Sequence, residues 1–238
     1  MLDAWLDLVL GSRCSACGTP GRALCPPCDT ALVPRPAVAW PTPSPAGLVL
    51  PVAALEYDGA VRMLVVDHKE HGRLALARPL GRLLAAAVRE ACLDAGPALP
   101  VVVDLVPVPS HPAVVRGRGH DPLLRIARAA AGELRRDGAD VVVRRLLRVR
   151  ARPGDQAALG AAERAANLRG RFEARAPAGG GCASRSLLLV DDVITTGATL
   201  REAQRALEVV GLAPRAAVTV AATRRRHRPR LPVAGPED

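Results

Sequence analysis

Aromatic residues and lysine are almost absent from this chain of 238 residues. Aromatic side chains make up 2% of the sequence, which argues against recognition of bases by stacking. No apolar run approaches the roughly 20 residues that a membrane-spanning helix needs. The first residues, Met1 to Trp5, also lack the basic start of a secretory signal. We therefore expect a cytoplasmic protein without a membrane span.

The rarest residue types are each reduced to one position. Lys69 is the only lysine, Asn167 the only asparagine, Tyr57 the only tyrosine and Phe172 the only phenylalanine. The abundant residues include arginine, alanine, glycine, proline and valine, whose codons are GC-rich, and this indicates a strongly biased genome. A residue type that has vanished elsewhere is expected to persist where a commoner residue cannot replace it.

The positive charge has two interpretations. The formal net charge of +10 suggests an anionic partner, such as nucleic acid or a polyphosphate ligand. Since almost all of this charge is arginine, codon bias acting on a solvated basic surface explains it equally well. The charge alone therefore does not decide between a ligand site and an ordinary surface.

Composition divides the chain into four segments. Residues 1–33 hold four of the six cysteines, and residues 34–47 form a Pro-rich stretch that we expect to be a semi-rigid linker. Residues 48–223 are long enough to form the main domain around one substantial core. Residues 224–238 are a basic, Pro-rich tail without a core face, and we expect them to be disordered.

Strands and helices are expected to alternate in the main domain. Continuous apolar runs indicate buried strands, and a helical period of apolar residues indicates helices. The alternation predicts an α/β fold with an open, mainly parallel sheet and right-handed crossovers. The expected strands span 49–57, 101–106, 141–147, 187–190 and 216–222, and the expected helices span 74–92, 122–136, 159–168 and 198–210.

Four cysteines near the N-terminus form two CxxC pairs, Cys14 with Cys17 and Cys25 with Cys28. Each pair lets two thiolates converge on one ion from a tight turn, so the four predict a closed tetrahedral zinc site. Disulfide pairing is the alternative, which a reducing cytosol disfavours. No recognition helix follows the second pair, so we expect a structural or docking role for this module, not catalysis.

A second motif combines acidic and hydroxyl residues. The apolar run 187–190 ends in two adjacent carboxylates, Asp191 and Asp192, and a turn of small residues then opens a helix. Backbone N–H groups at a helix start bind phosphate, while the carboxylates suit a sugar diol and a hydrated magnesium ion, which together describe a ribose 5-phosphate. The alternative is a capping turn without a ligand. The residues assigned to the phosphate are Thr195, Thr196, Gly197, Ala198 and Thr199.

This turn resembles the 5-phosphoribosyl-1-pyrophosphate (PRPP) loop of type I phosphoribosyltransferases, which have the same strand, acidic pair and turn. Four further stretches narrow the family. Together with the paired CxxC start, their order resembles the ComF family, also described as competence protein F or GntX-like proteins, over nearly the whole chain. The stretches are Tyr57-Asp58-Gly59 followed by Lys69, Val106–Pro109 followed by 116–121, Gln156 with Arg164 and Asn167, and Phe172.

The resemblance implies a type I phosphoribosyltransferase domain behind an N-terminal zinc ribbon, with PRPP and magnesium as ligands. It implies that Lys69 and Arg118 act as catalytic residues at the pyrophosphate and that Arg116 also contacts PRPP. The chain departs from the family at His120 and Asp121, where an Arg-Gly-Phe-Asn signature usually places phenylalanine and asparagine. This departure argues against a base-stacking role at that position.

Two further pairs of polar residues lie near these motifs. Arg164 and Asn167 are three residues apart and would share one face of a helix, where we expect a structural role. His68 and His71 flank Lys69. They can be read as a metal-binding pair, but we interpret them as part of a solvated helix end.

Two functions remain open. The first is an enzyme in which an acceptor displaces pyrophosphate at C1 of PRPP; no residue identifies the acceptor or a base that activates it. The second is a non-enzymatic or PRPP-sensing protein of DNA uptake. In that case the cationic surface, zinc module and tail would engage single-stranded DNA, alongside competence-machinery proteins. Pyrophosphate release from PRPP and salt-dependent DNA binding distinguish the two.

Overall fold

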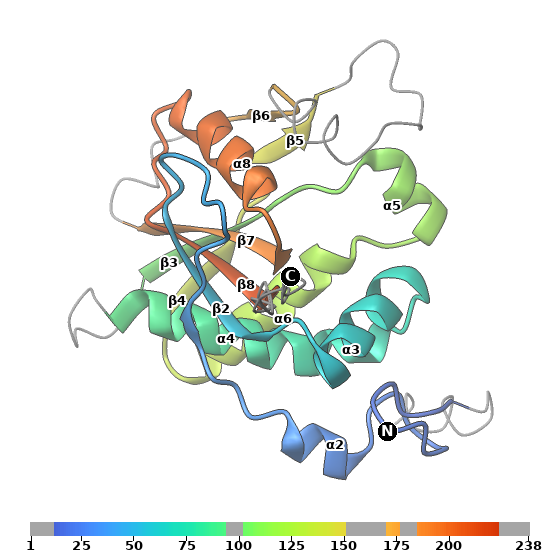
Figure 1. Cartoon of the computed structure of the whole chain (residues 1–238). Coiled ribbons are helices and arrows are strands. Elements are labelled where there is room, and N and C mark those ends of the chain that lie inside the picture. Colours follow the sequence, from blue (N-terminus) through green and yellow to red (C-terminus); the bar gives the residue numbers. More distant parts are fainter. Residues whose placement is uncertain (1–11, 94–101, 151–169, 177–184, 224–238) are drawn as a thin grey trace, which may run out of the picture.

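The structure is a computed structural model that describes residues 12–93, 102–150, 170–176 and 185–223 (Figure 1). At its centre lies a six-stranded sheet in the order β1-β2-β8-β7-β3-β4. Five neighbouring strands, β2, β8, β7, β3 and β4, run parallel to one another. Strand β1 pairs antiparallel with β2 at the edge of the sheet. The strand bounds are Ala37–Val38 (β1), Leu50–Glu56 (β2), Val102–Pro107 (β3), Asp140–Val143 (β4), Ser186–Ile194 (β7) and Ala216–Ala222 (β8).

Helices cover both faces of this sheet, which confirms the predicted α/β class with a mainly parallel sheet. The helices α4 (Ala77–Leu93) and α6 (Pro122–Arg136) pack on one face, and α8 (Ala198–Glu208) packs on the other (Figure 1). A separate two-stranded antiparallel ribbon of β5 (Leu147–Val149) and β6 (Phe172–Ala174) lies against α8. Two more helices follow the carboxyl ends of β2 and β3: α3 (Gly59–Glu70) and α5 (Pro112–Arg118).

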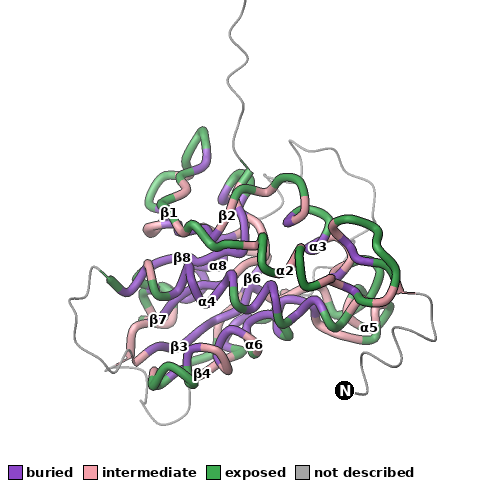
Figure 2. Tube along the Cα trace, turned by 90° about the horizontal axis from the view of Figure 1, so that it is seen from below, coloured by how far each residue is buried: buried purple, intermediate pink, exposed green. Residues whose placement is uncertain are grey.

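The core lies between the sheet and α4 and α6. Figure 2 shows the buried residues concentrated in the central strands and in these helices. Strand β7 begins with an apolar run in which Leu188 and Leu189 are completely buried, as expected for a strand covered on both faces. The two helices approach closely at Gly81, where a Cβ would come within 2.5 Å of the Cβ of Ala129. Only glycine therefore fits at this contact.

The expected elements differ from the structure in a few places. Helix α6 and strand β8 have the predicted bounds. Strand β7 extends four residues past Val190 and includes Asp191 and Asp192, because its pairing with β8 continues to Ile194. The strand expected at 141–147 is divided between β4 and β5. Helices α3 and α5 were not predicted, and the helix expected at 159–168 lies outside the described residues.

The Pro-rich stretch, which we expected to be a linker, lies against the sheet and α8. It contains the edge strand β1, whose Ala37 and Val38 pair with β2. Its far end is held by α8, since Arg201 donates to the carbonyl of Ala46 at 3.0 Å and Gln204 donates to that of Gly47 at 2.9 Å. This part of the chain therefore lies beside the start of α8.

The cysteine-containing segment forms a small unit next to α3 (Figure 1). It contains a short bridge between Arg13 and Pro20 and the helix α2 (Pro26–Ala31). Within the described parts of the chain, no helix combines the length and apolar character needed to cross a membrane.

Candidate functional site

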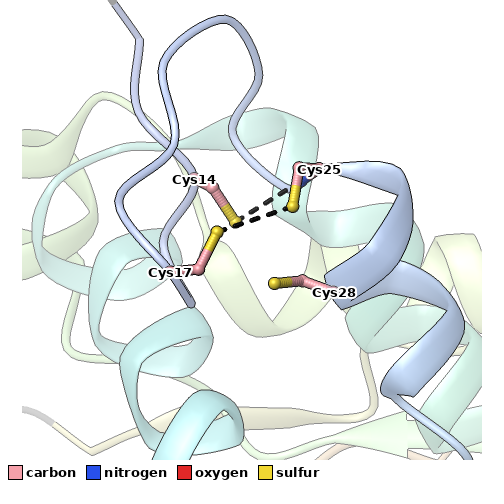
Figure 3. Close-up of side chains that lie close together, drawn as sticks. All are labelled: Cys14, Cys17, Cys25 and Cys28. Atoms are coloured by element: carbon pink, nitrogen blue, oxygen red, sulfur yellow. Dashed lines mark hydrogen bonds between the residues drawn. The ribbon is translucent and has the colours of Figure 1, made fainter.

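The four predicted cysteines converge on one point. Cys14 and Cys17 approach from the first knuckle, and Cys25 and Cys28 approach from the start of α2 (Figure 3). All four sulfur atoms lie within 4.8 Å of one another, and those of Cys17 and Cys25 are 3.6 Å apart. Zinc–sulfur bonds of about 2.3 Å place tetrahedral thiolates about 3.8 Å apart. The cluster therefore fits a four-coordinate zinc ion without an open position.

The electrostatics of the cluster favour a cation. Hydrogen bonding to Thr19, whose hydroxyl oxygen is 3.1 Å from the sulfur, lowers the pKa of Cys17 to about 6. Interactions with the Cys25 and Cys17 side chains raise the pKa of Cys28 to about 12. The four sulfurs therefore cannot all ionise near neutral pH without a compensating positive charge. A bound divalent ion would supply that charge.

The proposed phosphate turn lies between β7 and α8. Its Gly197 is the N-cap of α8 and has a φ of +71°, a conformation that side chains disfavour. Gly197 offers no side-chain acceptor to the first turn of α8, where the N–H of Ala198 donates to the hydroxyl of Thr196 at 3.4 Å. An anion can replace this long contact. A Cβ at Gly197 would lie 3.0 Å from both Pro41 and Leu48, so the Pro-rich stretch also requires glycine here.

The solitary lysine reaches the acidic pair. Lys69, at the end of α3, donates to Asp192 at 2.5 Å across the carboxyl edge of the sheet. Both side chains are partly exposed, by 39% for Lys69 and 15% for Asp192, so a ligand can reach the pair. They open into a cavity of about 450 Å³. Its other polar lining residues include Tyr57, Ser110, Asp191, Thr195 and Thr199, and its apolar lining includes Phe172.

The charges of the acidic pair and Lys69 shift one another's pKa values. Desolvation and the neighbouring charge of Asp192 raise the pKa of Asp191 to about 8. Although burial acts in the opposite direction, Asp192 and Asp191 raise the pKa of Lys69, which stays a cation. One lysine thus faces two carboxylates, and a bound divalent cation would favour ionisation of Asp191.

The two arginines expected at the pyrophosphate have different surroundings. Arg118 donates to both carboxylate oxygens of Glu70, at 2.7 and 2.5 Å, next to Lys69 on α3. Arg116 lines a second cavity of about 250 Å³ together with Arg145. This second cavity shares the segment Val108–Ser110 with the first one, so the two are neighbours.

A third cavity, of about 710 Å³, lies on the other side of the phosphate turn. Thr195, Thr196 and Ala198 line it, together with the Pro-rich stretch and the ends of β2 and β8. Trp40, which is 50% exposed, forms part of its wall, and Glu56 is its acidic side chain. Neither lysine nor arginine lines this cavity among the described residues.

His68 has a structural role that the sequence did not predict. The expectation of a solvated helix end is wrong for it, because it is completely buried. Its Nδ1 lies 3.1 Å from the carbonyl oxygen of Arg73, and its Nε2 lies 3.2 Å from that of Pro122. The helical spacing of Val61, Leu64 and His68 on the buried side of α3 was the available signal. The other positions singled out from the sequence, Gln156, Arg164 and Asn167, lie outside the described residues.

No family model and no curated protein matches this chain. Among solved structures, the chain is similar to the hypoxanthine-guanine phosphoribosyl transferase of L. donovani, with a TM-score of 0.35 and 15% sequence identity. The similarity covers 62% of this chain and 67% of that one. Membership of the ComF family therefore stays a prediction from the motifs.

Proposed function

We propose that this protein binds PRPP with magnesium and transfers its phosphoribosyl group to an acceptor, releasing pyrophosphate. The observation that carries the proposal is the cavity where Lys69, Asp191 and Asp192 meet the glycine-capped start of α8. A helix start suits the 5-phosphate, adjacent carboxylates suit the ribose diol, and a lysine suits the pyrophosphate. PRPP contains all three of these groups in one small molecule.

Each chain segment then has a defined role. The turn Thr195–Thr199 donates backbone and hydroxyl hydrogen bonds to the 5-phosphate, and Asp191 and Asp192 accept from the ribose hydroxyls. Lys69, which pairs with Asp192 in the free protein, turns toward the pyrophosphate when PRPP enters. Magnesium, when bound, supplies further positive charge at the departing pyrophosphate. A nucleophilic atom of the acceptor forms a bond to C1, and the C1–oxygen electron pair leaves with the pyrophosphate.

The neighbouring cavities suggest where the two reaction partners lie. Arg116 and Arg145 line the cavity on the β3 side, and this cationic surface suits the pyrophosphate end. The cavity beside Trp40 has no lining lysine or arginine among the described residues and lies on the β8 side. Because an acceptor attacks C1 from the face opposite to the leaving group, we propose that it enters from the Trp40 side.

Pyrophosphate release from PRPP tests this activity. The protein is incubated with PRPP, magnesium and a panel of nucleobases and other nitrogen nucleophiles, and pyrophosphate is measured. We expect release that depends on both magnesium and one class of acceptor. A protein that binds PRPP but releases no pyrophosphate with any acceptor would support a PRPP sensor and contradict the enzyme.

The DNA-uptake function draws no specific support from the described residues. Several of their arginines are engaged by carboxylates, as with Arg82 and Asp29 or Arg201 and Glu208. The basic tail 224–238 lies outside the described residues. Binding of single-stranded DNA that weakens steeply with added salt, without PRPP turnover, would favour this alternative.

A further inference from the structure

The last turn of α3 joins four parts of the molecule through four consecutive side chains. Asp67 accepts from Arg73 at 3.1 Å, toward the cysteine module. His68 bonds to the carbonyl of Pro122 at the start of α6. Lys69 donates to Asp192, and Glu70 accepts from Arg118. A displacement of this turn therefore reaches the candidate PRPP site through Lys69.

The cysteine module is attached to this turn beside a metal-ligand position. Nη1 of Arg73 donates to the hydroxyl of Ser15 at 2.6 Å as well as to Asp67. The side chain of Ser15 also hydrogen-bonds directly to Asp67. Ser15 follows Cys14 directly, within the knuckle that holds two of the four thiolates. Ser15 is 9% exposed and Arg73 is largely buried at this contact, so water competes weakly for the hydrogen bonds.

A second attachment joins the cysteine module to a different helix and serves as a control for the first. Asp29, directly after Cys28, accepts two hydrogen bonds from Arg82 at 2.7 and 3.1 Å. Arg82 belongs to α4, not to α3. Both attachments hold the module, but only the one through Arg73 reaches the turn that carries Lys69.

We propose that metal occupancy of the four-cysteine module sets the position of Lys69 at the acidic pair, with Ser15 and Arg73 as the positioning residues between them. When the metal leaves, the thiolates lose the charge that holds them together, and the knuckle around Ser15 changes shape. Arg73 then loses one of its two partners, and Asp67 loses its connection to the module. The effect is graded, because Nε2 of His68 still holds α3 against the start of α6. The link to PRPP affinity rests on the function proposed above; the link to Lys69 does not.

The solitary lysine allows this coupling to be measured without any ligand. Lys69 carries the only side-chain amine of the chain, so its rate of acylation by an amine-reactive reagent is read from one peptide by mass spectrometry. Release from Asp192 lowers the pKa of the amine and exposes it, and both changes speed the reaction. We expect removal of zinc by a chelator to raise the rate about three- to tenfold.

Two variants that keep all four cysteines separate this path from loss of folding. Ser15→Ala removes the hydroxyl that Arg73 contacts and should retain zinc, yet should also speed acylation of Lys69. Arg82→Ala removes the second attachment and should leave the rate unchanged. Unchanged acylation after zinc removal and in Ser15→Ala would overturn the coupling, and equal effects of the two variants would overturn the role of the Ser15 attachment. A purified protein that binds no zinc would also overturn the proposal, because no metal would then be present to set the position of Lys69.

A calorimetric titration with PRPP and magnesium then separates this inference from the proposed function. If the parent binds PRPP, Ser15→Ala should weaken binding by about three- to tenfold, and Arg82→Ala should not. If the parent does not bind PRPP while zinc removal still speeds acylation, the proposed function fails and the coupling stands. Tight PRPP binding by Ser15→Ala would limit the coupling to Lys69 itself and contradict its effect on affinity.

Discussion

The residues of the cysteine module are close together in the sequence, whereas those of the candidate PRPP cavity are far apart. All four thiolates come from a short stretch between Cys14 and Cys28, and local turns bring them together. The cavity depends on Lys69 and Asp192, which lie 123 residues apart and meet only because β2, β7 and β8 are neighbours in the sheet. The cysteine cluster is therefore formed by local turns, whereas the cavity is formed by the domain core.

This difference predicts that disruption of either site leaves the other part of the molecule folded. Cys28→Ser should abolish stoichiometric zinc binding and unfold the module, since structural zinc contributes about 10 kcal/mol or more to folding in small zinc domains. The main domain should keep its cooperative unfolding transition. Metal analysis and thermal denaturation check both points. Cys92→Ala, at a buried cysteine outside the cluster, should keep its zinc, and a zinc-free but fully folded module would refute the assignment.

The solitary lysine should be sensitive to its shape as well as its charge. Lys69→Ala should weaken PRPP binding about tenfold or more, because a charge-assisted contact contributes on the order of 1.5–3 kcal/mol. Lys69→Arg should also weaken binding, since the planar guanidinium cannot replace a compact ammonium beside Asp192. Arg62→Lys, on the same helix, is the matched control and should bind normally. Full affinity in Lys69→Arg would show that the rarity of lysine has no functional meaning.

The phosphate turn should depend on its glycine for folding. Gly197→Ala forces a side chain into a positive φ and against Pro41 and Leu48, so we expect a loss of about 1–3 kcal/mol in the free energy of unfolding. Gly117→Ala in α5, where a Cβ meets no atom within 4 Å, should be neutral or slightly stabilising. Denaturant titration measures both. Equal stability of the two variants would contradict the packing of the Pro-rich stretch on this turn.

The acidic pair should cost stability as pH rises. The pKa of Asp191 is about 8 in the folded chain, above the value of about 4 expected when unfolded, so the folded state holds its proton more tightly. Stability from this group is complete below about pH 4 and is lost as pH rises through 8. Asp191→Asn should therefore stabilise the protein relative to the parent at about pH 9 more than at about pH 5.

A carboxylate with the opposite shift provides the control for this pH effect. Hydrogen bonding and the charge of Arg185 lower the pKa of Asp140, so its contribution is present at neutral pH and lost in acid. Asp140→Asn should therefore lower stability near neutral pH, with a difference that shrinks as pH falls through the lowered pKa of Asp140. Denaturant midpoints across pH measure both variants. A pH-independent effect of Asp191→Asn would show that its carboxyl group is not perturbed.

The sequence predicted those features that depend on local pattern. Helix α6 begins at Pro122 after the capping Asp121, and its apolar residues recur with a helical period, so its bounds could be predicted. The convergence of the four cysteines followed from their spacing. Helix α3 was harder to predict, because its buried positions Val61, Leu64 and His68 recur with a helical period but the last of them is polar.

The arrangement of the cavity depended on long-range pairing that no local pattern contains. Rarity and family resemblance singled out Lys69, but neither could show that it lies 2.5 Å from Asp192. No sequence pattern indicated that Arg118 contacts Glu70. The position of Trp40 in a third cavity was likewise not predicted, although aromatic residues are scarce in this chain. Such contacts are fixed by how the strands are ordered, which the periodicity of single segments does not determine.

Calorimetric titration with PRPP in the presence of magnesium, on the parent and on the Asp191→Asn, Asp192→Asn double variant, tests the central claim most directly. The carboxylates line the cavity at the carboxyl end of β7, so the variant should keep the fold while losing measurable PRPP binding. Circular dichroism and thermal denaturation confirm the fold of both proteins. The account predicts saturable, magnesium-dependent binding by the parent and none by the variant. Equal affinity of the two proteins, or no binding by a folded, zinc-loaded parent, would contradict it.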